Sequence, residues 1–158
     1  CGGYQLMGKY YRDADGSEIK GLGLFDYYTV APASRRKRCI GNIVIETQKT
    51  GVPVKVVGFE NHGGQTMGVK SPFGKVLCGN GNCSKSENEG YCEKNVIATY
   101  LHGPLLAKNP EISDHIIGYC MQRKLNAGGS AEKYELPKLD DTLEIKCRSV
   151  MLERLLKK

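Results

Sequence analysis

Hydrophobic positions along the chain follow two different spacings. Two β-branched runs, IGNIVIET (40–47) and PVKVVGFE (53–60), flank the turn-like QKTGV and predict a hairpin or a pair of neighbouring strands. A third such run, NVIATYLHG (95–103), includes His102 and stops at a Gly-Pro break. We therefore expect three strands in the middle of the chain, with His102 at the C-terminal tip of the third.

Farther along, the apolar residues recur with the 3.6-residue period of helices. In the segment 109–125 the apolar stripe has four members: Ile112, Ile116, Cys120 and Leu125. In the segment 140–158 it has five: Leu143, Cys147, Val150, Met151 and Leu155. Asp141 followed by Glu144 resembles a capping box at the start of the last helix. The mixture of strands and helices predicts an α/β protein.

The first residues, CGGYQLMGKYY, predict a short buried helix, because Leu6 and Tyr10 are four positions apart. Cys-Gly-Gly running straight into a helix resembles the second half of a strand–turn–helix elbow. The strand that would feed this elbow does not precede Cys1 in the sequence. We therefore expect residues 1–158 to be the C-terminal part of a single domain whose sheet is incomplete.

Composition narrows the classes of partner. Four of the net six positive charges lie in the run 35–38, so the chain lacks the spread of basic residues typical of nucleic-acid binders. No apolar run approaches the roughly 18 residues that span a membrane. The seven cysteines are odd in number, which favours a reducing, cytoplasmic setting. Cys78, Cys83 and Cys92 lack CxxC spacing, so incidental loop cysteines are favoured over a zinc site, and no metal is expected.

Two sets of residues could carry chemistry. A nucleophilic Cys1 would gain from a helix N-terminus, from the free amide of Gly2 and from a base such as His102. Asn61-His62-Gly63 directly follows a strand and could bind a small polar ligand. The alternatives stay open on spacing alone: a processed terminal cysteine, an ordinary strand-end histidine, and a polar turn. His115 is interpreted as a solvated helix histidine.

These motifs together resemble the class I, triad-type, glutamine amidotransferases, in the branch that contains cobyric acid synthase glutaminase domains. CGGYQ matches the Cys-x-Gly-x-Gln nucleophile motif of that family. Four further stretches match in order, up to about residue 114: DGSEIKGLGLFDYYT, RCIGNIVIE, VGFENHGGQT and TYLHGPLLAKNPEISD. Within the branch, the match is nearest to glutaminase subunits of lipid II isoglutaminyl synthases. The resemblance implies a flavodoxin-like, three-layer α/β sheet.

The resemblance also implies residue roles. Cys1 would attack the side-chain amide of glutamine, and His102 would move the protons. Gly2 would sit in the oxyanion hole, and Arg38 would bind the glutamine carboxylate. Two further groups of residues would line the glutamine pocket: Gln5, and Asn61 with His62. The neighbouring cations 35–37 fall in a short insertion relative to the family pattern.

One departure from the family concerns the third member of the triad. Many relatives carry a glutamate two residues after the catalytic histidine, where this chain has Pro104. The resemblance implies that a MurT-like Mur-ligase subunit supplies an aspartate across the interface, so the isolated chain should be a weak glutaminase. That partner would use ATP and Mg²⁺ to amidate the D-glutamate of lipid II, a membrane lipid intermediate, and this subunit would need no cofactor.

Three rival interpretations remain open. In N-terminal-nucleophile amidotransferases the α-amine of the first cysteine is the base, so His102 would be dispensable. A degraded amidotransferase could act only as a non-catalytic scaffold. A glutaminase of the cobyric acid synthase type would deliver ammonia to a corrinoid instead.

Overall fold

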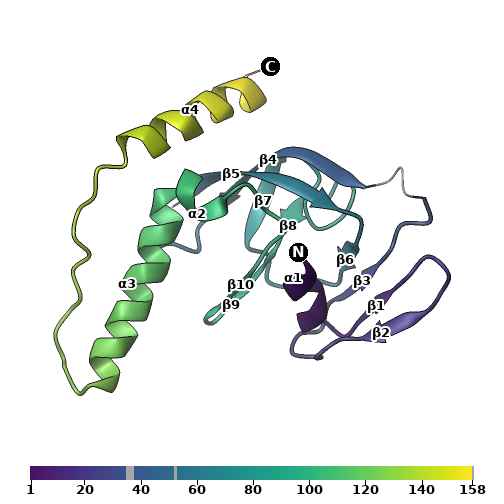
Figure 1. Ribbon diagram of the computed structural model, residues 1–158, viewed down its shortest axis with the longest axis horizontal. Helices are drawn as coiled ribbons and strands as arrows, with labels where there is room; N and C mark the ends of the chain where they lie inside the picture. Colours follow the sequence, from purple (N-terminus) through teal and green to yellow (C-terminus); the bar gives the residue numbers. More distant parts are fainter. Residues whose placement is uncertain (35–37, 52, 158) are drawn as a thin grey trace.

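A computed structural model describes residues 1–34, 38–51 and 53–157 (Figure 1). Strands and helices mix throughout, so the α/β class predicted from the sequence is confirmed. The basic residues 35–37, which we place in an insertion, lie outside the described residues. Across the described chain, no helix is both long and apolar enough to cross a bilayer.

The largest sheet contains the predicted strand pair. Its strand order is β5-β4-β7-β8, formed by Val54–His62, Cys39–Thr47, Gly74–Cys78 and Asn88–Glu89. β4 and β5 are antiparallel, and their register pairs Cys39 with His62 at one end and Thr47 with Val54 at the other. The neighbouring-strand prediction is therefore confirmed. Residues 43–45 are all fully buried, so both faces of β4 are covered and strict alternation is lost.

A second sheet lies beside helix α1 (Gly2–Met7). Its strand order is β2-β1-β3-β6, formed by Glu18–Lys20, Tyr10–Arg12, Tyr28–Val30 and Gln65–Met67. β1 and β3 are parallel, whereas the other pairs in this sheet are antiparallel. A separate hairpin joins β9 (Tyr91–Glu93) to β10 (Val96–Ala98).

Helix α1 is shorter than we predict from the Leu6–Tyr10 spacing. It ends at Met7, Leu6 is half exposed, and Tyr10 begins β1. The cause is Gly8, whose backbone is extended and packs so closely on Tyr27 that a Cβ would lie 2.7 Å from the Tyr27 carbonyl oxygen. Tyr4 anchors the helix instead, within an aromatic cluster that includes Tyr27, Tyr91 and Tyr100.

The strand that leads toward His102 also ends earlier than predicted. β10 stops at Ala98, because the buried Glu89 carboxylate accepts hydrogen bonds from the Thr99 hydroxyl at 2.9 Å and the Tyr100 amide at 2.6 Å. His102 instead forms an isolated antiparallel bridge with Phe59 of β5. The prediction that His102 lies at a strand tip is therefore wrong, although the residue remains fixed at the edge of the main sheet.

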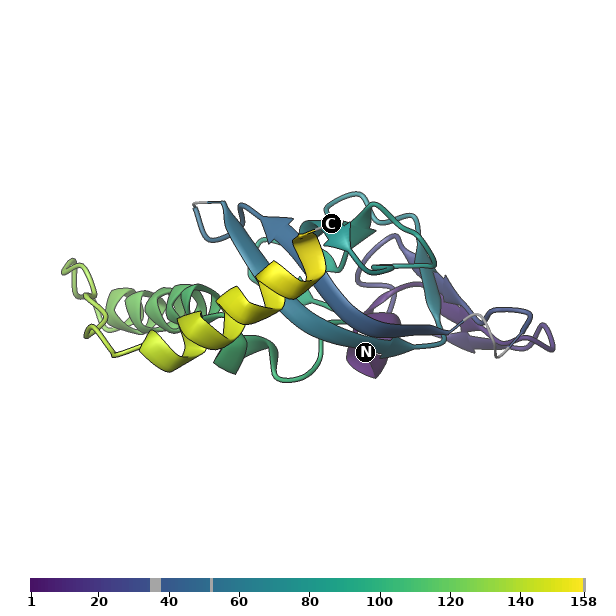
Figure 2. The ribbon, with the colours of Figure 1, turned by 90° about the horizontal axis from the view of Figure 1, so that it is seen from above.

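Three helices complete the chain: α2 (Leu105–Lys108), α3 (Pro110–Ala127) and α4 (Thr142–Leu156). Helix α3 projects from the sheets, an extended connector follows it, and α4 returns to lie across β4 and β5 (Figures 1 and 2). Both long helices are where we predict them. A core cluster of β4 and β5 residues with Phe73 is joined by Ile112, and Ile116 packs against it.

The predicted apolar stripes are buried only in part. Cys120 on α3 is exposed, and on α4 Leu143 is 77% exposed and Val150 50% exposed. The capping box is also absent: Asp141 is the N-cap residue but makes no side-chain cap. Asp140 takes this role, because its carboxylate accepts hydrogen bonds from the amide and hydroxyl of Thr142.

Candidate active site

Cys1 occupies the N-cap position of α1, and its thiol is exposed. The Cys1 carbonyl accepts the amide of Gln5 at 3.1 Å, which closes the first helical turn. The Cys1 nitrogen donates to the Thr99 carbonyl at 3.4 Å. Cys1, the candidate nucleophile, is thereby hydrogen-bonded to Thr99, which lies three residues before His102 in the sequence.

The exposed His102 is held by its backbone. Its amide donates to the Phe59 carbonyl at 2.7 Å, and the Phe59 amide donates back at 3.0 Å. Gly103 follows with φ +83°, a conformation that favours glycine and turns the chain away after the bridge. Cys1 and His102 are therefore linked through the short segment 99–102, and the His102 side chain is exposed.

A cavity of about 270 Å³ lies along the exposed side of α1. Its lining residues come from α1 and from the β1–β2 region: Gly2, Gln5, Leu6, Tyr11, Ile19, Lys20 and Gly21. Two predicted site residues, Gly2 and Gln5, thus share one cavity, while Cys1 and His102 are not among the lining residues. The cavity therefore borders α1 directly after Cys1, and most of its lining is apolar.

Arg38 and Asn61 meet at the open end of the β4–β5 hairpin. The guanidinium of Arg38 donates to the Asn61 side-chain oxygen at 2.9 Å. The register explains the contact, because Cys39 pairs with His62 and so places the residues flanking that pair together. The positive charge of Arg38 also acts on the phenol of Tyr11, which lines the cavity of Gly2 and Gln5. The cation is therefore placed where a ligand carboxylate could meet it.

The two glycines after His62 allow the loop to pack tightly against this site. A Cβ on Gly63 would lie 3.3 Å from Arg38 Nη1, and one on Gly64 would lie 2.4 Å from Gln5 Nε2. A side chain at position 64 would also meet the Thr29 methyl group at 2.7 Å and would displace Gln5, whereas at position 63 the flexible Arg38 guanidinium needs to shift by only a few tenths of an ångström. Glycine is therefore required at position 64, where the backbone itself approaches a predicted ligand-binding side chain.

His62 differs from the other predicted site residues because its side chain is fully buried. Its Nδ1 lies 2.7 Å from the Gly64 carbonyl oxygen, and its ring stacks on Tyr100 at a centroid distance of 3.7 Å. Burial lowers the pKa of His62 and favours the neutral ring. The structure therefore places His62 behind Tyr100, and a direct contact with a ligand stays a prediction.

Two buried carboxylates support the site and were missed by sequence reasoning. Glu60 accepts hydrogen bonds from the amide and side chain of Asn80 and from the Gly81 amide, at 2.8–3.0 Å. Glu89 lies under the 99–100 segment, and burial raises its pKa to about 8. Acidic residues are normally exposed, so the sequence gives no sign that Glu60 and Glu89 are buried. Only their hydrogen bonds to residues distant in the sequence, seen in the structure, reveal it.

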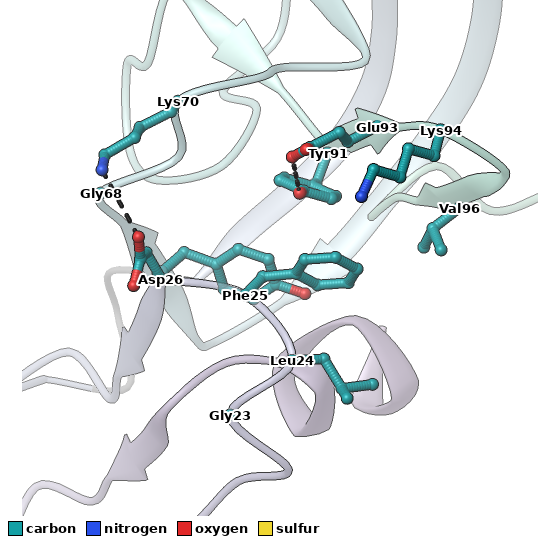
Figure 3. A pocket seen from close by; sticks show the side chains of 11 residues that line it. Gly23, Leu24, Phe25, Asp26, Gly68, Lys70, Tyr91, Glu93, Lys94 and Val96 are labelled. Atoms are coloured by element: carbon teal, nitrogen blue, oxygen red, sulfur yellow. Dashed lines mark hydrogen bonds and ion pairs between the residues drawn. The ribbon is translucent and has the colours of Figure 1, made fainter.

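Another cavity, of about 320 Å³, lies at the opposite end of α1 and is a poorer candidate (Figure 3). It contains none of the predicted site residues, and both of its carboxylates already have partners: Asp26 pairs with Lys9 and Lys70, and Glu93 accepts the Tyr91 hydroxyl. No group of three or more potential metal-ligand side chains occurs among the residues that the structure describes. We therefore place the candidate site at the N-terminal end of α1.

Comparison with known proteins supports the same region. The CobB/CobQ-like glutamine amidotransferase domain family matches residues 1–110. The chain belongs to this family. The match covers every predicted site residue of this amidotransferase domain, from Cys1 to His102, and ends where α3 begins. The family resemblance predicted from the sequence is thus confirmed.

Individual relatives refine the comparison. The domain is 41% identical over 154 residues to the "Lipid II isoglutaminyl synthase (glutamine-hydrolyzing) subunit GatD" of Staphylococcus aureus, covering 98% of this chain and 58% of that protein. It is 35% identical over 145 residues to the same-named subunit of Streptococcus pneumoniae, covering 90% and 52%. A "Probable cobyric acid synthase" of Methanococcus maripaludis is 32% identical over 133 residues, covering 78% and 26%. The chain spans about half the length of the GatD relatives that it matches.

Proposed function

We propose that this chain is part of a glutaminase that hydrolyses glutamine to glutamate and ammonia and passes the ammonia to a Mur-ligase-like partner. The partner would use ATP and Mg²⁺ to amidate the D-glutamate of lipid II during peptidoglycan synthesis. The observation that carries the proposal is the 41% identity to a GatD subunit along 98% of the chain. The cobyric acid synthase match is lower in identity and shorter.

In the proposed reaction, the Cys1 sulfur attacks the side-chain amide carbon of glutamine. The amide of Gly2 donates to the oxygen that becomes negatively charged, and His102 transfers a proton to the departing amine. Ammonia leaves and a glutamyl thioester remains. Water then attacks the thioester, His102 accepts its proton, and glutamate is released as the Cys1 thiolate re-forms.

Recognition of glutamine would rest on the neighbouring side chains. Arg38, held in place by Asn61, would bind the α-carboxylate, because a guanidinium and a carboxylate form charge-assisted hydrogen bonds. Gln5, which lines the cavity beside Gly2, would contact the rest of the amino acid. Because Pro104 replaces the usual glutamate, the partner subunit would orient His102 with its own carboxylate.

The proposal extends to the setting of the protein. Residues 1–158 would form the C-terminal part of one amidotransferase domain, and the chain would need no metal or cofactor of its own. All seven cysteines are unpaired, which fits a reducing compartment, so we propose a cytoplasmic location.

The decisive experiment uses the full-length protein with its partner and a glutamine-mimicking electrophile, diazo-oxo-norleucine. Mass spectrometry should find one adduct on Cys1, lost in Cys1→Ala and retained in the control Cys120→Ala, which removes another exposed thiol. Absence of any adduct with the partner present would support a non-catalytic scaffold. Full glutaminase activity in His102→Ala would support the N-terminal-nucleophile alternative.

The cobyric acid alternative concerns only the acceptor. The family match favours it as the second candidate, because that family takes its name from CobB/CobQ-like proteins. Supplying the purified complex with glutamine, ATP and either lipid II or a corrinoid acid separates the two. Amidation of lipid II alone supports the main proposal, and a Mur-ligase-like gene beside this one would agree with it.

A further inference from the structure

A buried polar chain lies directly behind Gln5. Tyr100 is fully buried, and its hydroxyl oxygen accepts Gln5 Nε2 at 3.2 Å. The same hydroxyl lies 2.6 Å from the Thr66 hydroxyl, which in turn lies 2.9 Å from that of Thr29. Because Tyr100 has one proton and that proton can go to Thr66, its oxygen is free to accept from Gln5.

The plane of Tyr100 is set by His62. The two rings stack at 3.7 Å with only 5° between their planes. His62 itself cannot turn freely, because its Nδ1 bonds to the Gly64 carbonyl and its ring is buried. Its Nε2 faces Glu60 Oε2 at 4.0 Å and has no hydrogen-bond partner within the described chain. His62 therefore contributes mainly a flat, fixed surface for Tyr100.

This arrangement determines which end of the Gln5 amide a ligand meets. With Nε2 bonded to Tyr100, the Oε1 atom is the one left for a molecule in the cavity. An amide oxygen accepts hydrogen bonds from an ammonium or amide N–H, but it repels a carboxylate. A free glutamine side chain could present either end, whereas here Nε2 is the end that faces Tyr100 while the Tyr100 proton goes to Thr66.

We propose that Tyr100, clamped by His62, is a positioning residue that fixes the Gln5 amide and so makes the site prefer glutamine over glutamate. The inference rests on the proposed function, since it concerns the substrate of the same site. Tyr100 acts through Gln5 and does not itself touch substrate. His62 acts one step farther away, through the ring stack.

The test compares Tyr100→Phe with Tyr27→Phe in the full-length protein with its partner. Tyr27 is equally buried in the same aromatic cluster, and its hydroxyl donates to the Tyr4 carbonyl at 2.7 Å without reaching Gln5. Tyr100→Phe should raise KM for glutamine about tenfold, change kcat less than threefold, and strengthen inhibition by glutamate relative to KM. Tyr27→Phe should lower the thermal midpoint similarly and leave both constants within twofold. Equal KM values in the two variants would overturn the proposal.

A double-mutant cycle asks whether Tyr100 acts through Gln5. In a Gln5→Ala background, Tyr100→Phe should cause no further rise in KM, because the group that it orients is gone. Independent, multiplying effects would overturn the proposed route. Should Tyr100→Phe not fold, His62→Ala carries the test, because it removes the ring that stacks on Tyr100. It should raise KM for glutamine in the wild type and cause no further rise in the Gln5→Ala background, and an unchanged KM in the wild type would overturn the proposal.

Failure of this inference can be told apart from failure of the proposed function. If wild-type Cys1 is labelled by diazo-oxo-norleucine but Tyr100→Phe leaves KM unchanged, only the positioning role is lost. If wild-type Cys1 is not labelled with the partner present, the glutaminase proposal itself fails.

Discussion

Residues 1–110 and helix α4 differ in which kinds of side chain they bury. In residues 1–110, acidic side chains such as Glu60 and Glu89 are fully buried and hydrogen-bonded among strands. In α4, apolar side chains such as Leu143 and Val150 face solvent, and an Arg148–Glu111 ion pair ties the helix to α3. The family match also ends at residue 110. The strand region should therefore determine both stability and the site, and α4 neither.

The largest expected effect concerns the pH dependence set by Glu89. Its pKa is raised from about 4.5 to about 8 by burial, so the folded protein keeps a proton that the unfolded chain releases. The resulting stability is present below pH 4.5 and is lost as the pH rises through 8. The free energy of unfolding of the wild type should fall by about 4 kcal/mol between pH 4.5 and pH 8, relative to Glu89→Gln. Urea unfolding at pH 5, 6.5 and 8 would measure it, and parallel curves would contradict the assignment.

Removing the candidate base should affect the rate and leave the fold intact. His102→Ala is expected to lower glutaminase kcat about 10³-fold, because proton transfer to the leaving amine is lost. The His102 side chain is exposed and the bridge to Phe59 uses only backbone atoms, so the thermal midpoint should stay unchanged. His115→Ala, an exposed histidine on α3, is the control and should retain full activity.

Asn109 lies at the boundary between the two regions. Among the polar side chains near this boundary, its removal should lower the free energy of unfolding the most. Fully buried, its amide pairs with both backbone groups of Val57 at 2.9 Å and with the Leu105 carbonyl at 2.6 Å. Asn109→Ala leaves these groups unpaired and should lower the free energy of unfolding by about 2–4 kcal/mol. Asn126→Ala, on the exposed side of α3, should change it by less than about 0.5 kcal/mol. Denaturant titration would compare the two.

The smallest effect is expected in α4. Arg148→Ala removes the pair with Glu111, which is partly exposed and should contribute about 1 kcal/mol or less. Glutaminase activity should not change. A loss of both activity and stability would show that α4 supports the site, and would contradict the view that residues 1–110 alone determine it.

The sequence allowed the β4–β5 pair and both long helices to be predicted, because each has a sustained period and clear breaks. It could not show that β10 ends at Ala98, since the cause is a hydrogen bond from Tyr100 to a glutamate eleven residues earlier. Tyr100 itself was missed because a tyrosine in a β-branched run indicates packing, and its contact with Gln5 joins residues 95 positions apart. Periodicity also predicted the apolar stripe of α4, but it could not show that Leu143 and Val150 of this stripe are exposed to solvent.

The register of the β4–β5 hairpin places its connecting turn far from the candidate site. The pairing of Cys39 with His62 puts Arg38 and Asn61 at one end, while the connecting turn begins at Gln48, roughly 30 Å along the strands. Surface turns of this kind tolerate inserted residues well. A fluorophore or short affinity peptide attached near Gln48 would thus report on binding of the proposed partner without contacting the candidate site.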